Sequence, residues 1–272
     1  MFEQARVGFI GGGNMGEALI KGLIAADLLK PQQINVFEVI PARLEYLDVT
    51  YGICQSSSIA DLASAATIIV LAVKPQTMPA VLTELRSHLS HSPLVISIAA
   101  GVPLSALAKP LPEGLPVIRV MPNTPALVQE GASALARGPH VSDEQMQQAL
   151  ALFRAVGKAV EVDDKLMDTV TGLSGSGPGY ILLLLESFID AGVLMGLPRP
   201  IARELVLQTV AGTVKMVQET GKHPAELKDL VTSPGGTTIR GLTILEEQGV
   251  RGAIMRAIEA ATLRSRELGK GS

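Results

Sequence analysis

Val7-Gly8-Phe9-Ile10-Gly11-Gly12-Gly13-Asn14-Met15-Gly16 joins an apolar run to a glycine-rich turn near the amino terminus. Its glycines form G-x-G-x-x-G between a predicted strand and a predicted helix, a context that indicates a dinucleotide-binding turn. Such glycines permit the tight turn, the approach of a pyrophosphate and close helix packing, and the helix start offers free N–H groups to phosphate. An ordinary glycine-rich turn is the alternative. We predict a cofactor site that includes Ile10, Gly11, Gly13, Asn14, Met15 and Gly16.

Short apolar runs alternate with helical patterns through residue 163. The predicted strands are Arg6–Ile10, Ile34–Phe37, Thr67–Val73, Leu94–Ile98, Val117–Met121 and Ala159–Val162. Several of them are continuously apolar, which is typical of a parallel sheet covered on both faces. Helical patterns such as Met15–Ala26 and Asp143–Val156 lie between them, and Ser142 is the expected N-cap of the second. This alternation predicts an α/β Rossmann-type doubly wound sheet.

The strand pattern ends at Asp163, and the following residues are helical in character. We therefore predict a dinucleotide-binding domain over residues 1–163 and an all-helical domain over residues 164–272. Prolines at positions 198, 200 and 224 mark helix starts. The apolar stretch Tyr180–Leu197 contains Glu186 and Asp190, so we interpret it as a buried helix rather than a membrane span.

The composition excludes several classes of function. A net charge of −3, 3% aromatic residues and no tryptophan argue against a nucleic-acid-binding surface. Hydrophobic residues make up 47% and charged residues 18% of the 272, which predicts apolar surface buried between subunits. Cys54 is the only cysteine, so no intrachain disulfide can form and a reducing, cytoplasmic location is expected. The four histidines lack ligand spacing, and we predict no metal site.

Glu38 follows the predicted strand Ile34–Phe37, where an acidic side chain accepts hydrogen bonds from the ribose hydroxyls of NADH and repels the 2′-phosphate of NADPH. Arg43 lies nearby in sequence and could pair with that phosphate. Alternatively, Glu38 is a solvated carboxylate and Arg43 is its surface partner. We predict that both residues contact NADPH or NADH, with a lean toward NADH.

Further cofactor contacts are expected where other strands end, since ligands of open α/β sheets bind at the carboxyl ends of the strands. Ala72, Val73, Lys74 and Pro75 close the strand Thr67–Val73, and Ala99 and Ala100 follow the strand Leu94–Ile98. Met121-Pro122-Asn123-Thr124-Pro125 forms a stiff loop in which Asn123 is the candidate for the nicotinamide or the substrate. A turn-forming asparagine is the competing interpretation.

Two later motifs, Leu173-Ser174-Gly175-Ser176-Gly177-Pro178-Gly179-Tyr180 and Thr232-Ser233-Pro234-Gly235-Gly236-Thr237-Thr238-Ile239, make the whole chain resemble pyrroline-5-carboxylate reductase. The earlier motifs follow in family order. The resemblance implies reduction of 1-pyrroline-5-carboxylate to L-proline by NAD(P)H, a Rossmann domain followed by an all-α dimerisation domain, and a cytoplasmic homo-oligomer. Many family members have alanine where this chain has Gly179.

Ser233-Pro234-Gly235-Gly236 precedes an amphipathic helical pattern. Two glycines leave main-chain N–H groups unshielded at a helix start, which suits a carboxylate. A plain N-cap is the alternative. With the resemblance, the substrate carboxylate is assigned to Ser233, Gly236, Thr237 and Thr238, and Thr238 is also the predicted catalytic residue because its hydroxyl could orient the ring nitrogen.

Two other functions compete. A β-hydroxyacid-type dehydrogenase shares the layout but requires a general base, and Lys215 lacks the surrounding motif of that family. A non-catalytic dinucleotide sensor is possible on the fold alone. The Ser-Pro-Gly-Gly-Thr-Thr turn argues against a sensor, because a sensor does not need a second anion site.

Overall fold

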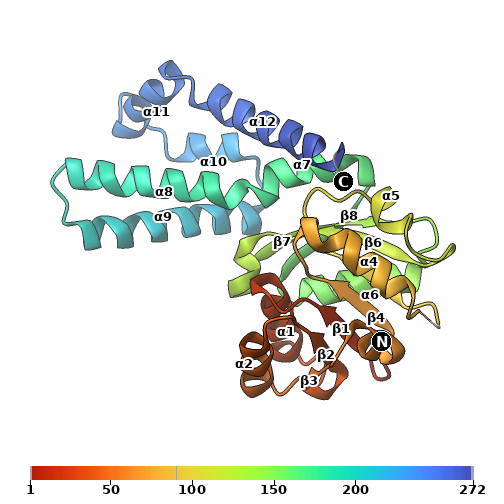
Figure 1. Cartoon of the computed structure of the whole chain (residues 1–272). Coiled ribbons are helices and arrows are strands. Elements are labelled where there is room, and N and C mark those ends of the chain that lie inside the picture. The colour runs from red at the N-terminus through yellow and green to blue at the C-terminus, as the bar shows by residue number, and fades with distance from the viewer. Residues whose placement is uncertain (1, 90, 271–272) are drawn as a thin grey trace. The chain divides into compact units, whose positions relative to one another are not determined.

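The structure is a computed structural model that describes residues 2–89 and 91–270 (Figure 1). Contacts within the chain divide it into two compact units. The first unit comprises Met1–Ser176 and Glu259–Ser272, and the second unit comprises Gly177–Ile258. Both units therefore include part of the last helix. The domain boundary between residues 163 and 164 stays a prediction.

The first unit is built on an eight-stranded sheet, counted over the described residues, with the strand order β3-β2-β1-β4-β5-β6-β7-β8. Neighbouring strands are parallel except β6 and β7, which are antiparallel. The strands are β1 (Val7–Ile10), β2 (Ile34–Phe37), β3 (Cys54–Gln55), β4 (Ile68–Leu71), β5 (Leu94–Ser97), β6 (Val117–Met121), β7 (Gly131–Arg137) and β8 (Gly157–Val162). The order reverses beside β1, which confirms the predicted doubly wound sheet.

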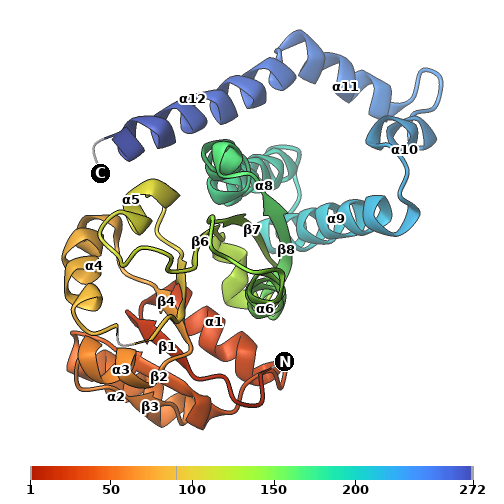
Figure 2. The ribbon, with the colours of Figure 1, turned by 90° about the vertical axis from the view of Figure 1, so that its right-hand side faces the viewer.

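Helices cover both faces of the sheet (Figure 2). Along one strand, Phe9 packs in the core that α1, α2 and α6 cover, and Ile10 packs in the core that α3, α4 and α5 cover. These two cores explain the continuously apolar strands, since each face needs its own apolar side chains. The helices are α1 (Asn14–Ala25), α2 (Pro41–Tyr51), α3 (Ile59–Ala65), α4 (Met78–Arg86), α5 (Leu104–Ala108) and α6 (Asp143–Arg154).

Ser142 caps α6 as predicted. Its hydroxyl accepts a hydrogen bond from the Gln145 N–H at 3.2 Å, and the Gln145 side chain accepts one from the Ser142 N–H at 3.0 Å. This reciprocal capping box satisfies two N–H groups that the helix itself cannot pair.

The strands β3 and β7 are missing from the sequence-based prediction. β7 consists of Gly131-Ala132-Ser133-Ala134-Leu135-Ala136-Arg137, residue types with low intrinsic strand preference. It forms because β6 and β8 pair with it on its two sides. Its antiparallel pairing with β6 departs from the parallel arrangement that the apolar strands indicate.

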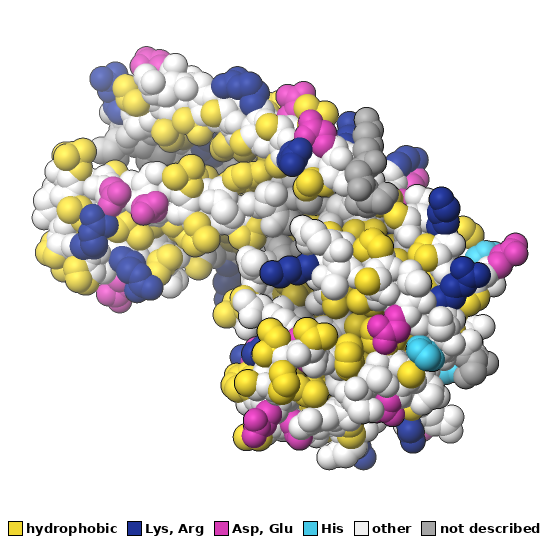
Figure 3. All heavy atoms as spheres, in the orientation of Figure 1, with side chains coloured by type: hydrophobic (Ala, Val, Ile, Leu, Met, Phe, Trp, Pro, Cys, Tyr) yellow, Lys and Arg dark blue, Asp and Glu magenta, His cyan; other side chains and the backbone are white. Residues whose placement is uncertain are grey.

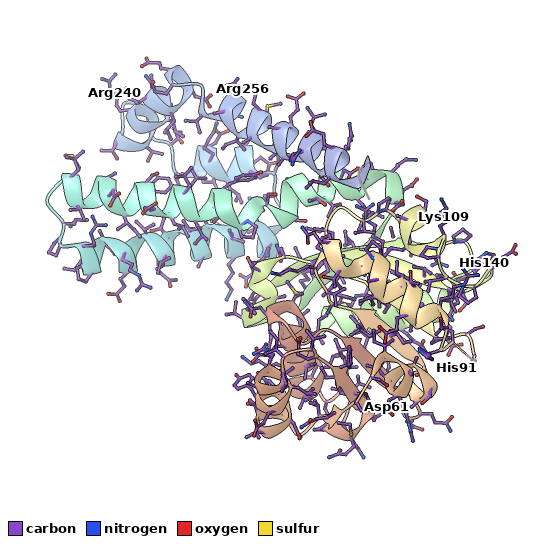
Figure 4. The ribbon with its side chains drawn as sticks, in the orientation of Figure 1. Asp61, His91, Lys109, His140, Arg240 and Arg256 are labelled. Carbon is purple, nitrogen blue, oxygen red and sulfur yellow. The ribbon has the colours of Figure 1, made fainter. Side chains whose placement is uncertain are left out.

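The second unit is helical. It contains α8 (Gly177–Leu194), α9 (Arg199–Thr220), α10 (Pro224–Leu230), α11 (Thr237–Glu247) and the start of α12 (Val250–Lys270), while the short α7 (Met167–Val170) belongs to the first unit. Prolines stand in the first turns of α9 and α10, as predicted. Figure 4 shows Arg240 and Arg256 extending from α11 and α12.

The prediction that Tyr180–Leu197 is a buried helix is wrong for the single chain. No residue of α8 is buried, and Leu182, Leu183 and Phe188 are all more than half exposed. Figure 3 shows hydrophobic side chains along the surface of this unit. By length and composition the helical stretch Asp164–Leu194 could cross a membrane, but core helices of soluble proteins pass the same test.

Candidate active site

The glycine-rich turn joins the ends of three strands. The Gly11 N–H donates to the Phe37 carbonyl oxygen at 2.8 Å, and the Ala72 N–H donates to the Ile10 carbonyl oxygen at 2.8 Å. Gly11 has φ +100°, and a Cβ at this residue would lie 2.6 Å from the Ala72 carbonyl oxygen. The turn therefore requires glycine both for its backbone conformation and for the close approach of β4.

The start of α1 is open to an anion. Its N-cap residue, Gly13, offers no side-chain cap, and a Cβ at Gly13 would meet no atom within 4 Å. Gly13 and Asn14 are exposed, whereas Gly16 is buried, and a Cβ at Gly16 would lie 2.9 Å from the Gly11 carbonyl oxygen. The unpaired N–H groups and the space at Gly13 suit a pyrophosphate, so these residues fit a dinucleotide.

A cavity of about 320 Å³ lies beside this turn. Seven predicted cofactor residues line it, namely Ile10, Gly11, Gly13, Glu38, Ala72, Val73 and Lys74. Five lining residues were not predicted, namely Phe37, Val39, Ile40, Thr77 and Val81. Phe37, Val39 and Ile40 lie at or just after the end of β2, where the carboxyl-end rule could have found them, whereas Thr77 and Val81 lie in the helical segment after β4.

The other predicted cofactor residues do not line this cavity. Ala99 is buried in the core after β5, and Ala100 is exposed next to it. Pro75 begins a 3-10 helix, Pro75–Thr77, that precedes α4. A larger cavity, of about 610 Å³, is lined by residues such as Leu104, Lys109 and His140 and contains none of the predicted site residues.

Glu38 and Arg43 both form hydrogen bonds with the main chain of Gly12. One Glu38 carboxylate oxygen accepts from the Gly12 N–H at 2.7 Å, and the other accepts from the Ile40 N–H at 3.1 Å. The Arg43 Nε donates to the Gly12 carbonyl oxygen at 2.7 Å, while its Nη2 pairs with Glu17 at 2.5 Å. The interpretation of Arg43 as the surface partner of Glu38 is therefore wrong, because its carboxylate partner is Glu17 of α1.

Glu17 is the centre of a hydrogen-bonded cluster. Its carboxylate also accepts from Tyr51 at 2.7 Å and from Tyr46 at 3.1 Å. Burial acts to raise the pKa of Glu17, but the hydrogen bonds from Arg43, Tyr51 and Tyr46 outweigh it and lower the pKa. Burial and the Glu17 contact raise the pKa of Tyr51 to about 12, so its phenol remains a donor at neutral pH.

Asn123 connects three segments of the main chain. Its Nδ2 donates to the Ser174 carbonyl oxygen at 3.0 Å, and its Oδ1 accepts from the Ala132 N–H at 2.8 Å. Ser174 belongs to a π-helical turn, Thr171–Gly175. Such turns are rare in proteins overall, and those that occur are often at functional sites. Neither bond is to the turn of Asn123 itself, so the side chain joins distant segments rather than forming a local turn, and its contact with a cofactor stays a prediction.

A buried arginine lies at the base of the loop that carries Asn123. Arg119 of β6 is only 4% exposed, and its guanidinium lies 3.1 Å from the Asp164 carboxylate and 3.7 Å from the Asp168 carboxylate. The Ser265 hydroxyl of α12 donates to Asp168 at 2.7 Å. Sequence reasoning missed this cluster, because its members are spread along the chain from position 119 to position 265 and share no motif.

In the second unit, the predicted substrate residues surround the start of α11. Its N-cap is Gly236, no side chain caps it, and the preceding Gly235 has φ +66°. A Cβ at Gly236 would lie 2.3 Å from the Ser233 Oγ. Thr237 is exposed and Thr238 is half-buried. The structure thus brings the four predicted residues together at an uncapped helix start, which is suited to a carboxylate.

The described residues contain no group of three or more His, Cys, Asp or Glu side chains that could hold a metal ion. Figure 4 shows His91 and His140 on separate loops of the first unit.

Comparison with known proteins follows the same two regions. Residues 6–101 match the family model described as NADP oxidoreductase coenzyme F420-dependent, and residues 164–268 match the one described as pyrroline-5-carboxylate reductase dimerisation. A pyrroline-5-carboxylate reductase of Methanosarcina acetivorans is 49% identical over 98% of this chain and 99% of its own length. The chain belongs to the pyrroline-5-carboxylate reductase family.

Solved structures of this family have the same fold. A pyrroline-5-carboxylate reductase from Coxiella burnetii has a TM-score of 0.93 and 36% identity, covering 98% of this chain and 99% of its own. The Plasmodium falciparum pyrroline carboxylate reductase, solved with NADP bound, has a TM-score of 0.89 and 36% identity, covering 99% of this chain and 100% of its own. The chain is therefore an oxidoreductase with a nicotinamide cofactor, which excludes the sensor and disfavours the hydroxyacid dehydrogenase.

Proposed function

We propose that this chain reduces 1-pyrroline-5-carboxylate to L-proline with NADPH or NADH. The observation that carries the proposal is the 49% identity, over nearly the full length of both chains, to a protein named pyrroline-5-carboxylate reductase. The open phosphate-binding turn at Gly13 and the uncapped start of α11 at Gly236 support it, because the reaction needs one dinucleotide and one carboxylate.

A bound dihydronicotinamide would supply the hydride for the imine carbon of the substrate, whose protonated ring nitrogen would become the secondary amine of proline. A protonated imine is already electrophilic, so the protein has mainly to bind and align the reactants. The start of α1 at Gly13 receives the pyrophosphate, Gly11 and Gly16 shape the turn that presents it, and Glu38 and Lys74 border the cavity for the adenosine end. Asn14, Met15, Arg43, Val73 and Asn123 remain proposed cofactor contacts.

The proposal assigns the substrate carboxylate to the N–H groups of α11 and to the side chains of Ser233 and Thr237. The Thr238 hydroxyl accepts from or donates to the ring nitrogen and fixes its orientation. Glu38 favours NADH, because a carboxylate at the ribose repels a 2′-phosphate.

Self-association is part of this proposal. The dimerisation model covers residues 164–268, and the second unit exposes a groove of about 390 Å³ between α8 and α9. The groove is lined by Phe188, Leu205, Val206, Thr209, Val210, Thr213 and Val214. A homodimer or a dimer-based oligomer would cover these side chains. The cytoplasmic location expected from the cysteine content stays a prediction.

The test is the initial rate of cofactor oxidation with 1-pyrroline-5-carboxylate, measured separately with NADH and NADPH. Turnover with either cofactor is expected. Thr238→Val should lower kcat at least tenfold, an amount comparable to one lost charge-assisted hydrogen bond. Thr243→Val is the matched control on the same helix, since the Thr243 hydroxyl donates to the Ile239 carbonyl oxygen within that helix. Absence of turnover with both cofactors, in a protein that binds them, would overturn the proposed reaction.

A further inference from the structure

The cluster around Glu17 holds Arg43, a proposed cofactor contact, by bonds to the protein itself. Arg43 is the cationic candidate for the 2′-phosphate of NADPH, yet it does not line the 320 Å³ cavity beside the glycine-rich turn. Its Nη2 is bonded to Glu17, and its guanidinium carbon lies 5.1 Å from the centre of the Tyr46 ring. Arg43 is therefore held against α1 and α2 rather than in the cavity.

Glu17 is itself firmly held. Its side chain is 20% exposed, and Tyr51 and Tyr46 donate to the same oxygen, Oε1, while Arg43 occupies the other. A carboxylate with three donors stays ionised at neutral pH. It therefore neutralises Arg43 and also restricts where the guanidinium can point, since a paired arginine holds its fork in one plane.

Arg43 also bonds to the glycine-rich turn. Its Nε donates to the carbonyl oxygen of Gly12, whose N–H donates to Glu38. Two carboxylates and one guanidinium thus surround a single residue of the turn, and their charges sum to a negative value. A ribose diol is compatible with that charge, whereas a 2′-phosphate is repelled unless Arg43 is released.

We propose that Glu17 is a positioning residue that sets cofactor specificity: by pairing with Arg43 it withholds the guanidinium from a 2′-phosphate and so favours NADH over NADPH. The inference rests on the proposed function, because it assumes that the cavity holds the adenosine end of the cofactor. Glu17 acts through Arg43 and does not need to touch the cofactor.

The experiment measures binding rather than turnover. Adenosine 2′,5′-bisphosphate and adenosine 5′-monophosphate differ only in the 2′-phosphate, and calorimetric titration gives a dissociation constant for each. Glu17→Gln should improve the affinity for the bisphosphate relative to the monophosphate by about tenfold, the effect of one newly available charge-assisted hydrogen bond. The ratio of kcat/KM for NADPH and NADH should shift in the same direction.

Two variants separate this role from others. Glu45→Gln removes one negative charge from α2 and should leave the affinity ratio within about twofold of wild type, since charges near the surface interact weakly. Arg43→Gln introduced together with Glu17→Gln should abolish the gain, because the released guanidinium is then absent. A gain that appears with Glu45→Gln, or that persists without Arg43, would overturn the proposal.

Other outcomes are equally decisive. If Glu17→Gln weakens both nucleotides by the same factor, Glu17 only supports the turn and the proposal is wrong. If Glu17→Gln does not fold, the single variant Arg43→Gln still tests the proposed role of Glu17. The affinity ratio should then change by less than about twofold, since a paired surface cation contributes little. A tenfold loss of bisphosphate affinity would show that Arg43 already serves the phosphate.

Failure of the proposed function gives a different result. If the wild-type protein binds neither nucleotide and does not reduce the imine with either cofactor, the proposed function itself is wrong. If the wild-type protein turns over normally and the affinity ratio does not respond to Glu17→Gln, only the specificity role is wrong.

Discussion

Gly13→Ala should separate cofactor binding from protein stability. The φ angle of Gly13 is −66°, which alanine adopts freely, and a Cβ there would meet no atom within 4 Å. Alanine restricts the unfolded chain, a gain of about 0.4–1 kcal/mol. It is also a poorer N-cap than glycine, a loss of roughly 0.5–1 kcal/mol. These effects offset each other, so the free energy of unfolding should change by less than about 0.5 kcal/mol.

Binding of the cofactor should respond strongly to the same substitution. The added methyl group occupies the space through which the pyrophosphate approaches the first N–H groups of α1. Displacing the phosphate weakens one or two charge-assisted hydrogen bonds, about 2–3 kcal/mol in total. The Kd for NADPH and for NADH should therefore rise roughly 30- to 150-fold.

Gly11→Ala is the contrasting variant, within the same turn. It combines φ +100° with a Cβ only 2.6 Å from the Ala72 carbonyl oxygen, an atom of the main chain next to β4. The free energy of unfolding should fall by at least about 2 kcal/mol, in addition to any loss of binding.

Urea unfolding followed by far-UV circular dichroism measures stability, and isothermal titration calorimetry measures binding. Circular dichroism is the appropriate probe because the chain has no tryptophan. If Gly13→Ala binds either cofactor as tightly as wild type does, the pyrophosphate does not approach Gly13 and the assigned cofactor geometry is refuted. Wild-type stability of Gly11→Ala would refute the account of the turn.

Three further predictions concern other parts of the chain. Asn123→Asp keeps the acceptor for the β7 N–H but places a carboxylate against the Ser174 carbonyl oxygen, so unfolding in urea should show a loss of about 1–3 kcal/mol. Val210→Glu puts a charge into the groove between α8 and α9, and sedimentation should show fewer oligomers and more monomer than wild type, with unchanged far-UV circular dichroism. The lowered pKa of Glu17 means that its contribution to stability is present above its ordinary pKa of 4.5 and is lost as pH falls through the lowered pKa. The unfolding free energies of wild type and Glu17→Gln should therefore converge as the pH is lowered from neutral through the lowered pKa of Glu17; a constant difference would contradict this.

Local patterns were sufficient for most of the fold. The glycine turn follows from Gly11, Gly13 and Gly16, whose spacing reflects three separate steric requirements within one strand–turn–helix unit. The capping box at Ser142 is likewise contained within one helical turn. β7 could not be predicted, because its alanine-rich sequence forms a strand only between two partners.

The candidate site was predicted less completely. Residues at the strand ends, such as Glu38 and Lys74, were identified because the carboxyl edge of a parallel sheet is implied by the strand pattern itself. The alternative that pairs Arg43 with Glu38 is wrong. Glu38 is closer in sequence, but Glu17 of α1 lies against α2 in the folded chain and takes the guanidinium.

The sequence by itself determined six of the eight described strands, the dinucleotide-binding turn and the family, because these depend on periodicity and on short motifs. Tertiary structure decided which polar groups pair. Asn123 bonds a carbonyl group 51 positions later, and Glu17 takes donors 26, 29 and 34 positions away. Hydrogen bonds act over about 3 Å, so a pair far apart in sequence is defined only when folding brings its two groups within that distance.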